Sequence, residues 1–176
     1  MDEETARRAR HIRLVAFDVD GVLTDGSITY TDKGDEIKSF NAQDGSAIKR
    51  LIASGIEVAL ITGRQSPMVE RRARELGIRH LHAGAADKLD ALNKLLDKLD
   101  LDAVACAYVG DDLPDLPVLE AVGLAVSVPN GQPEVRQAAH HVTERPGGNG
   151  AASDVCRLIL SVREHPPPGE PNRRQI

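Results

Sequence analysis

Short apolar runs alternate along this chain with segments of helical periodicity, and this alternation limits the folds open to it. Four runs have the length of buried strands, at residues 12–17, 56–61, 104–109 and 124–128. Between them, apolar residues recur at helical spacing, as at Leu89, Leu92, Leu95, Leu96 and Leu99. Continuous apolar strands separated by helices are typical of parallel sheets covered on both faces. The sequence therefore predicts an α/β fold with a doubly wound, mostly parallel sheet.

Two segments depart from this alternation. Residues 26–40 show period-two patterning on either side of Asp32-Lys33-Gly34, which predicts a short β-hairpin inserted after the first strand, with no separate cap domain. Residues 165–176 are rich in proline and poor in apolar side chains, so we expect a flexible tail. Residues 1–164 are then predicted to form one domain.

Composition and charge indicate which kinds of partner and which cellular location to expect. The formal net charge of −5 over 176 residues argues against a nucleic-acid partner. No apolar run approaches the ~20 residues of a membrane span, and the charged N-terminus lacks the apolar core of a signal peptide. Cys106 and Cys156 lie in apolar patterns that suit free buried thiols. These features predict a cytoplasmic protein that does not bind membranes.

Polar residues follow the predicted strands. Asp18 and Asp20 come after the first run, Thr62 after the second and Asp111 after the third, while Lys88 opens a helical stretch. Each has a structural reading as well: a Thr-Gly turn, a solvated lysine, or an acid that caps a helix. However, the carboxyl ends of parallel strands meet at one edge of a sheet. Their joint occurrence therefore predicts a functional site there.

This set of groups suits chemistry on a phosphate ester. Such an ester is an anion that repels nucleophiles, so its attack needs charge neutralisation and in-line positioning. One carboxylate can attack phosphorus while a second donates a proton to the leaving oxygen and later activates water. Carboxylates and a backbone carbonyl also form the all-oxygen ligand set that Mg²⁺ prefers.

With these motifs in this order, the chain resembles phosphatases of the haloacid dehalogenase superfamily. The resemblance implies that Asp18 is the nucleophile and Asp20 the general acid and base. It implies that Thr62 binds the phosphoryl group and Lys88 neutralises it. Asp18, Asp111 and the backbone carbonyl of Asp20 would hold Mg²⁺. Two further acids, which would orient Lys88 and metal-bound water, are Asp112 and Asp115.

A closer resemblance is to the 3-deoxy-D-manno-octulosonate 8-phosphate phosphatases of lipopolysaccharide sugar synthesis. It spans residues 12–162 and rests on residues 26–30, 36–41, 44–45 and 147–151. It implies a phosphorylated sugar acid substrate and a homotetramer in which a neighbouring subunit completes each site. Arg64 and Arg72 would contact the sugar carboxylate, because an arginine fork suits that group. The full set of implied substrate contacts is Asp20, Asn41, Ala42, Gln43, Asp44, Gly45, Lys49, Arg64, Arg72 and Lys88.

Several alternatives stay open. Lys49 and Asn149 depart from the family pattern, and phosphatases of nine-carbon sialic-type sugar acid phosphates share the same catalytic core. A catalytically silent scaffold would be expected to lack some of the acids, all of which are present. A phospho-accepting receiver domain carries similar residues, but its acidic pair precedes the hydroxyl residue and the lysine, whereas Asp111-Asp112 follows Lys88 here.

The hairpin is the expected site of assembly. An isolated two-stranded hairpin is marginally stable, so hairpins from several subunits are predicted to pair through Ile28, Tyr30 and Ile37. Strict alternation places Ile28 and Tyr30 on one face, whereas the side of Ile37 depends on the register. The alternative is a surface hairpin on a monomer.

Overall fold

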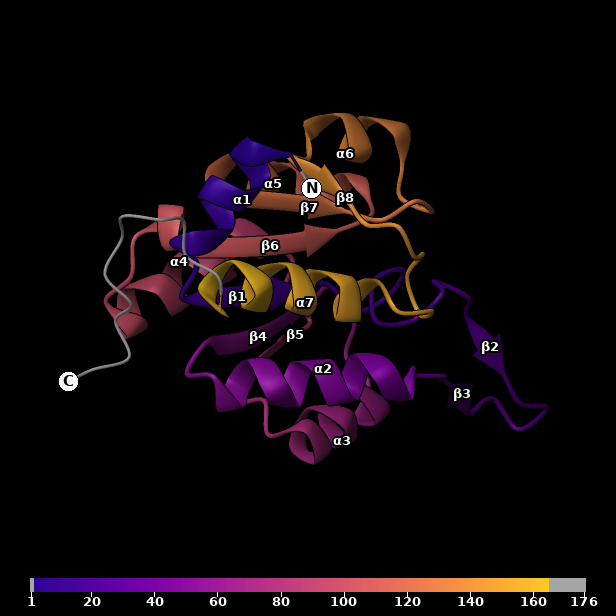
Figure 1. The fold of residues 1–176 in the computed structure, drawn as a ribbon. Helices are drawn as coiled ribbons and strands as arrows, with labels where there is room; N and C mark the ends of the chain where they lie inside the picture. The colour runs from indigo at the N-terminus through magenta and orange to yellow at the C-terminus, as the bar shows by residue number, and fades with distance from the viewer. Residues whose placement is uncertain (1, 165–176) are drawn as a thin grey trace.

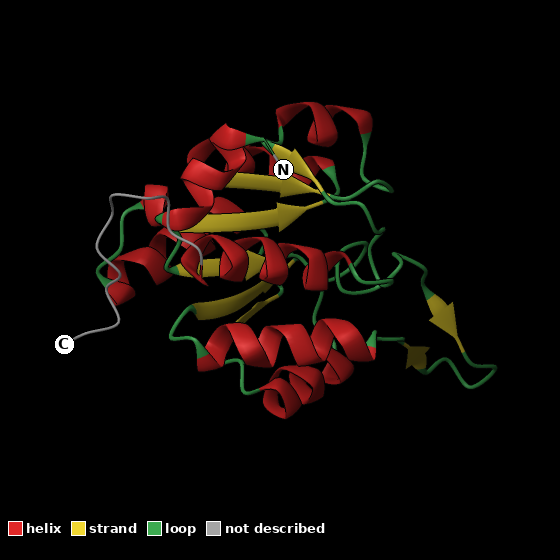
Figure 2. Ribbon diagram, in the orientation of Figure 1, coloured by secondary structure: helices red, strands yellow, loops and turns green. Residues whose placement is uncertain are grey.

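A six-stranded parallel sheet forms the centre of the computed structural model, which describes residues 2–164 (Figures 1 and 2). The strand order is β5-β4-β1-β6-β7-β8, and every neighbouring pair is parallel. The strands are β1 (Leu14–Phe17), β4 (Glu57–Thr62), β5 (His80–Ala83), β6 (Cys106–Gly110), β7 (Leu124–Ser127) and β8 (His141–Val142). The prediction of a mostly parallel α/β sheet is confirmed.

The two edge strands, β5 and β8, lie outside the four apolar runs. An edge strand has one neighbour and is partly exposed, so its sequence needs no continuous apolar stretch: all four residues of β5 are half-buried. The third run also starts later than its pattern indicates. Residues Ala103–Ala105 form a 3₁₀ turn, and the strand begins at Cys106.

Helices cover both faces of the sheet. One face packs against α1 (Glu3–Arg10), α2 (Ala42–Ala53), α3 (Pro67–Leu76) and α7 (Ala151–Glu164). The other face packs against α4 (Lys88–Leu99), α5 (Leu116–Ala121) and α6 (Pro133–Ala138). Alternate residues of β1 serve the two sides: Val15 and Phe17 belong to the first core, and Leu14 and Ala16 to the second. The sheet is therefore doubly wound. Among the described residues, no helix is both long enough and apolar enough to span a membrane.

The predicted hairpin consists of β2 (Thr29–Tyr30) and β3 (Glu36–Ile37), which form a separate antiparallel pair. Figure 2 shows it on the side of the sheet to which the strand arrows point. The register pairs Thr29 with Ile37 and Tyr30 with Glu36, so Tyr30 and Ile37 point to opposite faces. Ile28, Tyr30 and Ile37 are each at least half exposed. Both faces of the hairpin thus carry apolar surface.

Asp44 joins α2 to α7. Its carboxylate accepts hydrogen bonds from the backbone amides of Ser153, at 2.7 Å, and Gly150, at 3.3 Å. The side chain is buried, and burial raises its pKa, although these two amides oppose the shift. A carboxylate at the start of α7 satisfies amides that have no partner within the helix and interacts favourably with the helix dipole. Asp44 therefore fixes the start of α7 against α2.

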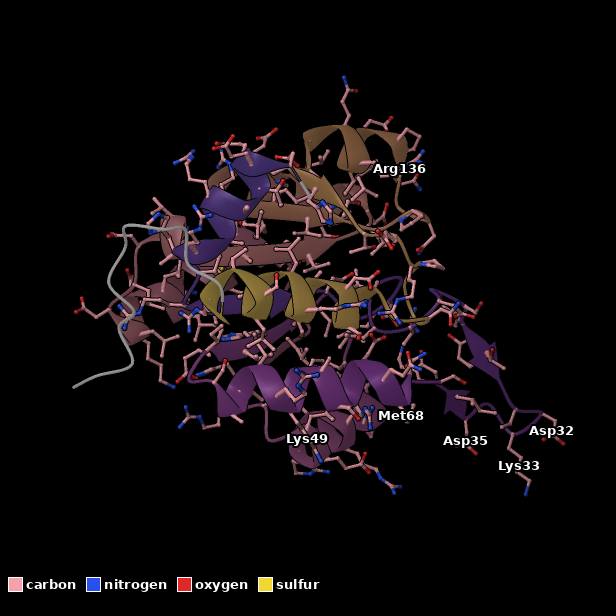
Figure 3. All side chains as sticks on the ribbon, viewed as in Figure 1. Asp32, Lys33, Asp35, Lys49, Met68 and Arg136 are labelled. Carbon is pink, nitrogen blue, oxygen red and sulfur yellow. The ribbon has the colours of Figure 1, made fainter. Side chains whose placement is uncertain are left out.

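We expect Asp44→Asn to lower the free energy of unfolding by about 1–3 kcal/mol, because the amide group of asparagine cannot accept a hydrogen bond from the second backbone amide. Urea unfolding followed by circular dichroism measures the change. Asp35→Asn, in the exposed hairpin loop (Figure 3), is the matched control and is expected to change stability by less than about 0.5 kcal/mol. Equal stability of the two variants would contradict this role for Asp44.

Candidate active site

Three neighbouring strands deliver the predicted polar residues to one edge of the sheet. β1 lies between β4 and β6, and these strands end immediately before Asp18, at Thr62 and immediately before Asp111, respectively. The backbone amide of Asp18 donates to the carbonyl of Val109, which extends the pairing between β1 and β6 to the first acid. The sheet therefore brings together the residues that the sequence places at separate strand ends.

A buried lysine links two of the acids. Lys88, the first residue of α4, has a side chain only 8% exposed, and its Nζ lies 2.9 Å from Asp18 Oδ1 and 2.7 Å from Asp115 Oδ1. Burial opposes its charge, but the two carboxylates outweigh burial and raise the pKa of Lys88. The lysine therefore carries a fixed positive charge beside Asp18.

Asp115 is fully occupied as a hydrogen-bond acceptor. Its Oδ1 accepts from Lys88 and from the buried Tyr108 hydroxyl, at 2.7 Å each, and its Oδ2 accepts from the backbone amides of Asp111, at 3.0 Å, and Asp112, at 3.1 Å. One side chain thus fixes both Lys88 and the backbone that carries Asp111. The Asp112 side chain, by contrast, accepts from the amide of Leu113.

Asp18, Asp111 and Asp115 each offer a carboxylate oxygen within 4.8 Å of the others. Burial raises the pKa of Asp18 to about 6; Asp115 adds to the shift and Lys88 opposes it. Burial, followed by the charges of Asp18 and Asp115, raises the pKa of Asp111 to about 8. The buried Oδ1 of Asp111 has no hydrogen-bond partner among the described residues. Because Asp115 is already occupied, Asp18 and Asp111 are the pair that fits a hard divalent cation.

Close backbone packing holds the loop that follows Asp18. Gly21 has a φ of +94°, and a Cβ there would overlap the Asp111 carboxylate, so both its conformation and its surroundings require glycine. The Gly21 carbonyl accepts a hydrogen bond from the Asn130 side chain, at 2.9 Å. Asn130 also accepts from the amide of Gly147, at 2.8 Å. Asn130 therefore joins the Asp18 loop to the glycine-rich segment; Asn149 of that segment is exposed.

Asp20 faces the base of the hairpin. Its Oδ1 is paired with the ammonium of Lys38, which also lies 3.4 Å from Glu36. Glu36 in turn accepts from Arg64, at 3.0 Å. Arg64 follows β4, and its guanidinium already has a carboxylate partner within the chain.

Other predicted contacts lie where β4 and α2 meet the site. The buried Thr62 hydroxyl accepts from the amide of Arg64 at 3.3 Å, and it donates to no acceptor within the described residues. Asn41 caps α2, and its carbonyl accepts from Arg72 at 3.1 Å. The Arg72 guanidinium also lies 5.7 Å from the centre of the Phe40 ring, a cation–π distance. A Cβ at Gly45 would overlap Arg72, so glycine makes room for it.

The remaining predicted contacts are more scattered. Ala42 and Lys49 are exposed on α2, with Lys49 two turns beyond the start of the helix (Figure 3). Gln43 accepts a hydrogen bond from Arg145, at 3.0 Å, and lines a cavity of about 300 Å³ between α2 and α7. Neither Asp18 nor Asp111 lines that cavity. Asp44 is engaged with α7, as described above.

Sequence reasoning missed Lys38, Tyr108 and Asn130. Tyr108 lies in an apolar strand. The only sign of its role in the sequence is the hydroxyl group, which needs a hydrogen-bond partner when the strand is buried. Lys38 lies in a hairpin whose other lysine, Lys33, is exposed. Asn130 follows β7 within Pro129-Asn130-Gly131, a sequence typical of a turn. The partners lie outside the local pattern: Tyr108 and Asp115 are 7 residues apart, Lys38 and Asp20 are 18 apart, and Asn130 and Gly21 are 109 apart.

Comparison with known proteins shows which family this chain resembles. The profile of the haloacid dehalogenase-like hydrolases matches residues 80–153. The 3-deoxy-D-manno-octulosonate 8-phosphate phosphatase KdsC of Yersinia pestis is 46% identical over 162 residues, which cover 92% of this chain and 87% of that protein. The protein of the same name from Escherichia coli K12 is 48% identical over 153 residues, or 87% of this chain and 81% of its own length.

Solved structures give the same result. The 3-deoxy-D-manno-octulosonate 8-phosphate phosphatase of Moraxella catarrhalis, in complex with a magnesium ion, a phosphate ion and a KDO molecule, superposes with a TM-score of 0.90. It is 49% identical, and the match covers 92% of each chain. The cobalt-bound phosphatase of Haemophilus influenzae superposes with a TM-score of 0.84 at 39% identity, covering 88% of this chain and 90% of that one. The predicted resemblance is confirmed: this chain belongs to the 3-deoxy-D-manno-octulosonate 8-phosphate phosphatase family of haloacid dehalogenase-like hydrolases.

Proposed function

We propose that this phosphatase hydrolyses 3-deoxy-D-manno-octulosonate 8-phosphate to the free sugar acid and phosphate, in lipopolysaccharide synthesis. The observation that carries the proposal is the Asp18 carboxylate, held 2.9 Å from Lys88 and beside a buried oxygen of Asp111 that has no hydrogen-bond partner in residues 2–164. The relatives at 46–49% identity support the substrate. A phosphatase acting on a nine-carbon sugar acid phosphate is the alternative.

The chain's own residues account for the two chemical steps. Asp18 attacks phosphorus, the bond to the sugar oxygen breaks, and Asp20 donates a proton to that oxygen, which leaves an aspartyl phosphate. Asp20 then takes a proton from a water molecule that attacks the phosphorus, and Asp18 is released with phosphate. Lys88 and the Thr62 hydroxyl bind the phosphoryl oxygens throughout.

Mg²⁺ fits the acids at the ends of β1 and β6. Asp18, Asp111 and the backbone carbonyl of Asp20 would hold it, with Asp112 near the water molecules that Mg²⁺ retains. When bound, it neutralises phosphoryl charge and stabilises the ionised forms of Asp18 and Asp111, whose pKa values are raised by burial and then by neighbouring carboxylates. Asp115 acts through Lys88, which it orients.

Recognition of the sugar acid involves the residues around the start of α2. Arg72 is already fixed over Phe40 and against the Asn41 carbonyl, so its position is set before substrate arrives. Arg64, which follows the end of β4, would contact the carboxylate in exchange for or in addition to Glu36. Asn41 to Gly45 and Lys49 complete the proposed contacts. Two buried free thiols, Cys106 and Cys156, suit action in the reducing cytoplasm.

Assembly as a homotetramer through the hairpin would complete the site. The hairpin pairs only two residues on each arm, too few for independent stability, and it exposes apolar side chains on both faces. It also lies on the side of the sheet where the strands end, beside the site (Figure 2). A neighbouring subunit would bury this surface and cover the open site.

The substrate proposal is tested with purified protein, Mg²⁺ and a panel of phosphorylated sugar acids. The eight-carbon 8-phosphate is expected to give the highest kcat/KM, with a nine-carbon 9-phosphate and a neutral sugar phosphate as controls, and chelation by EDTA is expected to abolish phosphate release. Preference for the nine-carbon substrate would support the alternative. Equal rates on neutral sugars would contradict recognition of the carboxylate.

Asp18→Asn is expected to reduce phosphate release on the order of 10³-fold or more, because the amide cannot attack phosphorus. The metal-free variant is expected to melt at or above the temperature of the metal-free parent. The folded-state pKa of about 6 lies above the ordinary value of 3.8, so at pH 7.5 the ionised carboxylate costs stability. Calorimetry at that pH measures the melting temperature. Near-parental activity would exclude the covalent route.

Deleting residues 28–37 and joining the ends with a short glycine linker is expected to give a smaller species in light scattering. Activity on the sugar acid phosphate is expected to fall sharply, because a neighbour would no longer cover the site. Ile37→Ser and Tyr30→Ser are milder variants that test the two faces separately. A deletion variant that keeps both its assembly and its activity would rule out this role.

A further inference from the structure

A row of ion pairs with alternating charges connects Asp20 to the hairpin. The Lys38 ammonium lies between the carboxylates of Asp20 and Glu36, and Glu36 lies between Lys38 and Arg64. The Lys38 side chain is 1% exposed, against 22% for Asp20 and 14% for Glu36. The most deeply buried member of this row of ion pairs is therefore Lys38, the cation that contacts Asp20.

The burial of Lys38 restricts how far its ammonium group can move away from Asp20. An ammonium group is kept out of water only where carboxylates compensate for its lost hydration, so Lys38 stays beside Asp20 and Glu36. The same contact fixes one oxygen of Asp20, Oδ1. Among the described residues, Oδ2 has no hydrogen-bond partner. The plane of the carboxylate is therefore set by one anchored oxygen, and the other remains available to a reacting group.

We propose that Lys38 is a positioning residue that orients Asp20 for proton transfer, with Oδ2 as the atom that carries the proton. Oδ2–H donates to the oxygen of the breaking P–O bond, and Oδ2 later takes a proton from the attacking water. The inference rests on the proposed phosphatase chemistry but not on the identity of the sugar acid. Lys38 follows β3 directly, so the position of the hairpin also bears on the alignment of Asp20.

A merely structural role for Lys38, as an anchor of the hairpin, gives a different kinetic result. Proton donation matters for a leaving group that departs as a strong base, such as an alkyl alcohol, and hardly at all for one that departs as a stable anion, such as p-nitrophenolate. Loss of alignment therefore harms poor leaving groups selectively. Loss of structure harms every substrate equally.

The experiment compares Lys38→Met and Lys38→Arg with the parent on p-nitrophenyl phosphate, phenyl phosphate and the best alkyl phosphate of the panel. The readout is kcat/KM, which reports steps up to the first irreversible one. Lys38→Met is expected to lose about 10-fold to 10²-fold more on the alkyl ester than on p-nitrophenyl phosphate, as part of the 10²–10⁴-fold due to acid–base help. Lys38→Arg keeps a cation beside Asp20 and is expected to recover part of this loss.

Lys33→Met is the matched control. Lys33 lies at the tip of the same hairpin and extends away from the rest of the molecule (Figure 3), so its replacement is expected to leave the leaving-group dependence unchanged. Asp20→Asn provides the second control. In that background Lys38→Met is expected to add less than about 2-fold, because the group that it orients no longer carries the proton.

Each remaining outcome is informative. Equal losses on all three esters, or no loss, would overturn the inference, and so would a full additional loss in the Asp20→Asn background. A parent that hydrolyses aryl and simple alkyl phosphates but no sugar acid phosphate would contradict the proposed substrate and leave the test of Lys38 intact. A parent without phosphatase activity on any ester would overturn both proposals.

Discussion

Lys88 carries a positive charge into the interior of the protein, where it contacts Asp18 and Asp115 together. An unpaired ammonium at this depth would cost several kcal/mol, so the two carboxylates and the lysine stabilise one another in place. Asp115 extends the effect, because its second oxygen accepts from the amides of Asp111 and Asp112. The proposed nucleophile Asp18, the cation beside it and the backbone of Asp111, a proposed metal ligand, thus depend on the buried contact of Lys88 with two acids.

The sheet topology makes that contact possible. β1 is central, and β4 and β6 flank it in parallel, so three strand ends meet although their residues are far apart in the sequence. Close packing restrains the arrangement further. Gly21 lies against the Asp111 carboxylate, and the Asn130 side chain hydrogen-bonds both the Gly21 carbonyl and the amide of Gly147, in the glycine-rich segment before α7. Asp44 then holds the start of α7 against α2. The core therefore positions Asp18, Lys88 and Asp111, whereas the hairpin reaches Asp20 through Lys38.

Much of this arrangement could be predicted from the chain alone. The parallel sheet, the helix around residues 89–99 and the hairpin follow from hydrophobic periodicity, and the set Asp18, Thr62, Lys88 and Asp111 follows from polar residues at strand ends and at a helix start. The edge strands β5 and β8 could not be found in this way, because half-exposed strands need no continuous apolar run. Lys38 and Tyr108 could not either, since their roles depend on partners 18 and 7 residues away along the chain.

The sequence by itself determined which chemical groups are present and, through the alternation of strands and helices, that they meet at one edge of a sheet. Local patterning has this power because strand and helix periods are properties of neighbouring residues. Only the tertiary structure decided how the charged groups are paired. Asp115 accepts a hydrogen bond from Lys88, and Asp44 accepts one from a backbone amide of α7. Asp20 and Arg64 are linked through Lys38 and Glu36 of the hairpin. The physical reason is that pairing energies depend on distance and burial, which are set only when distant segments pack together.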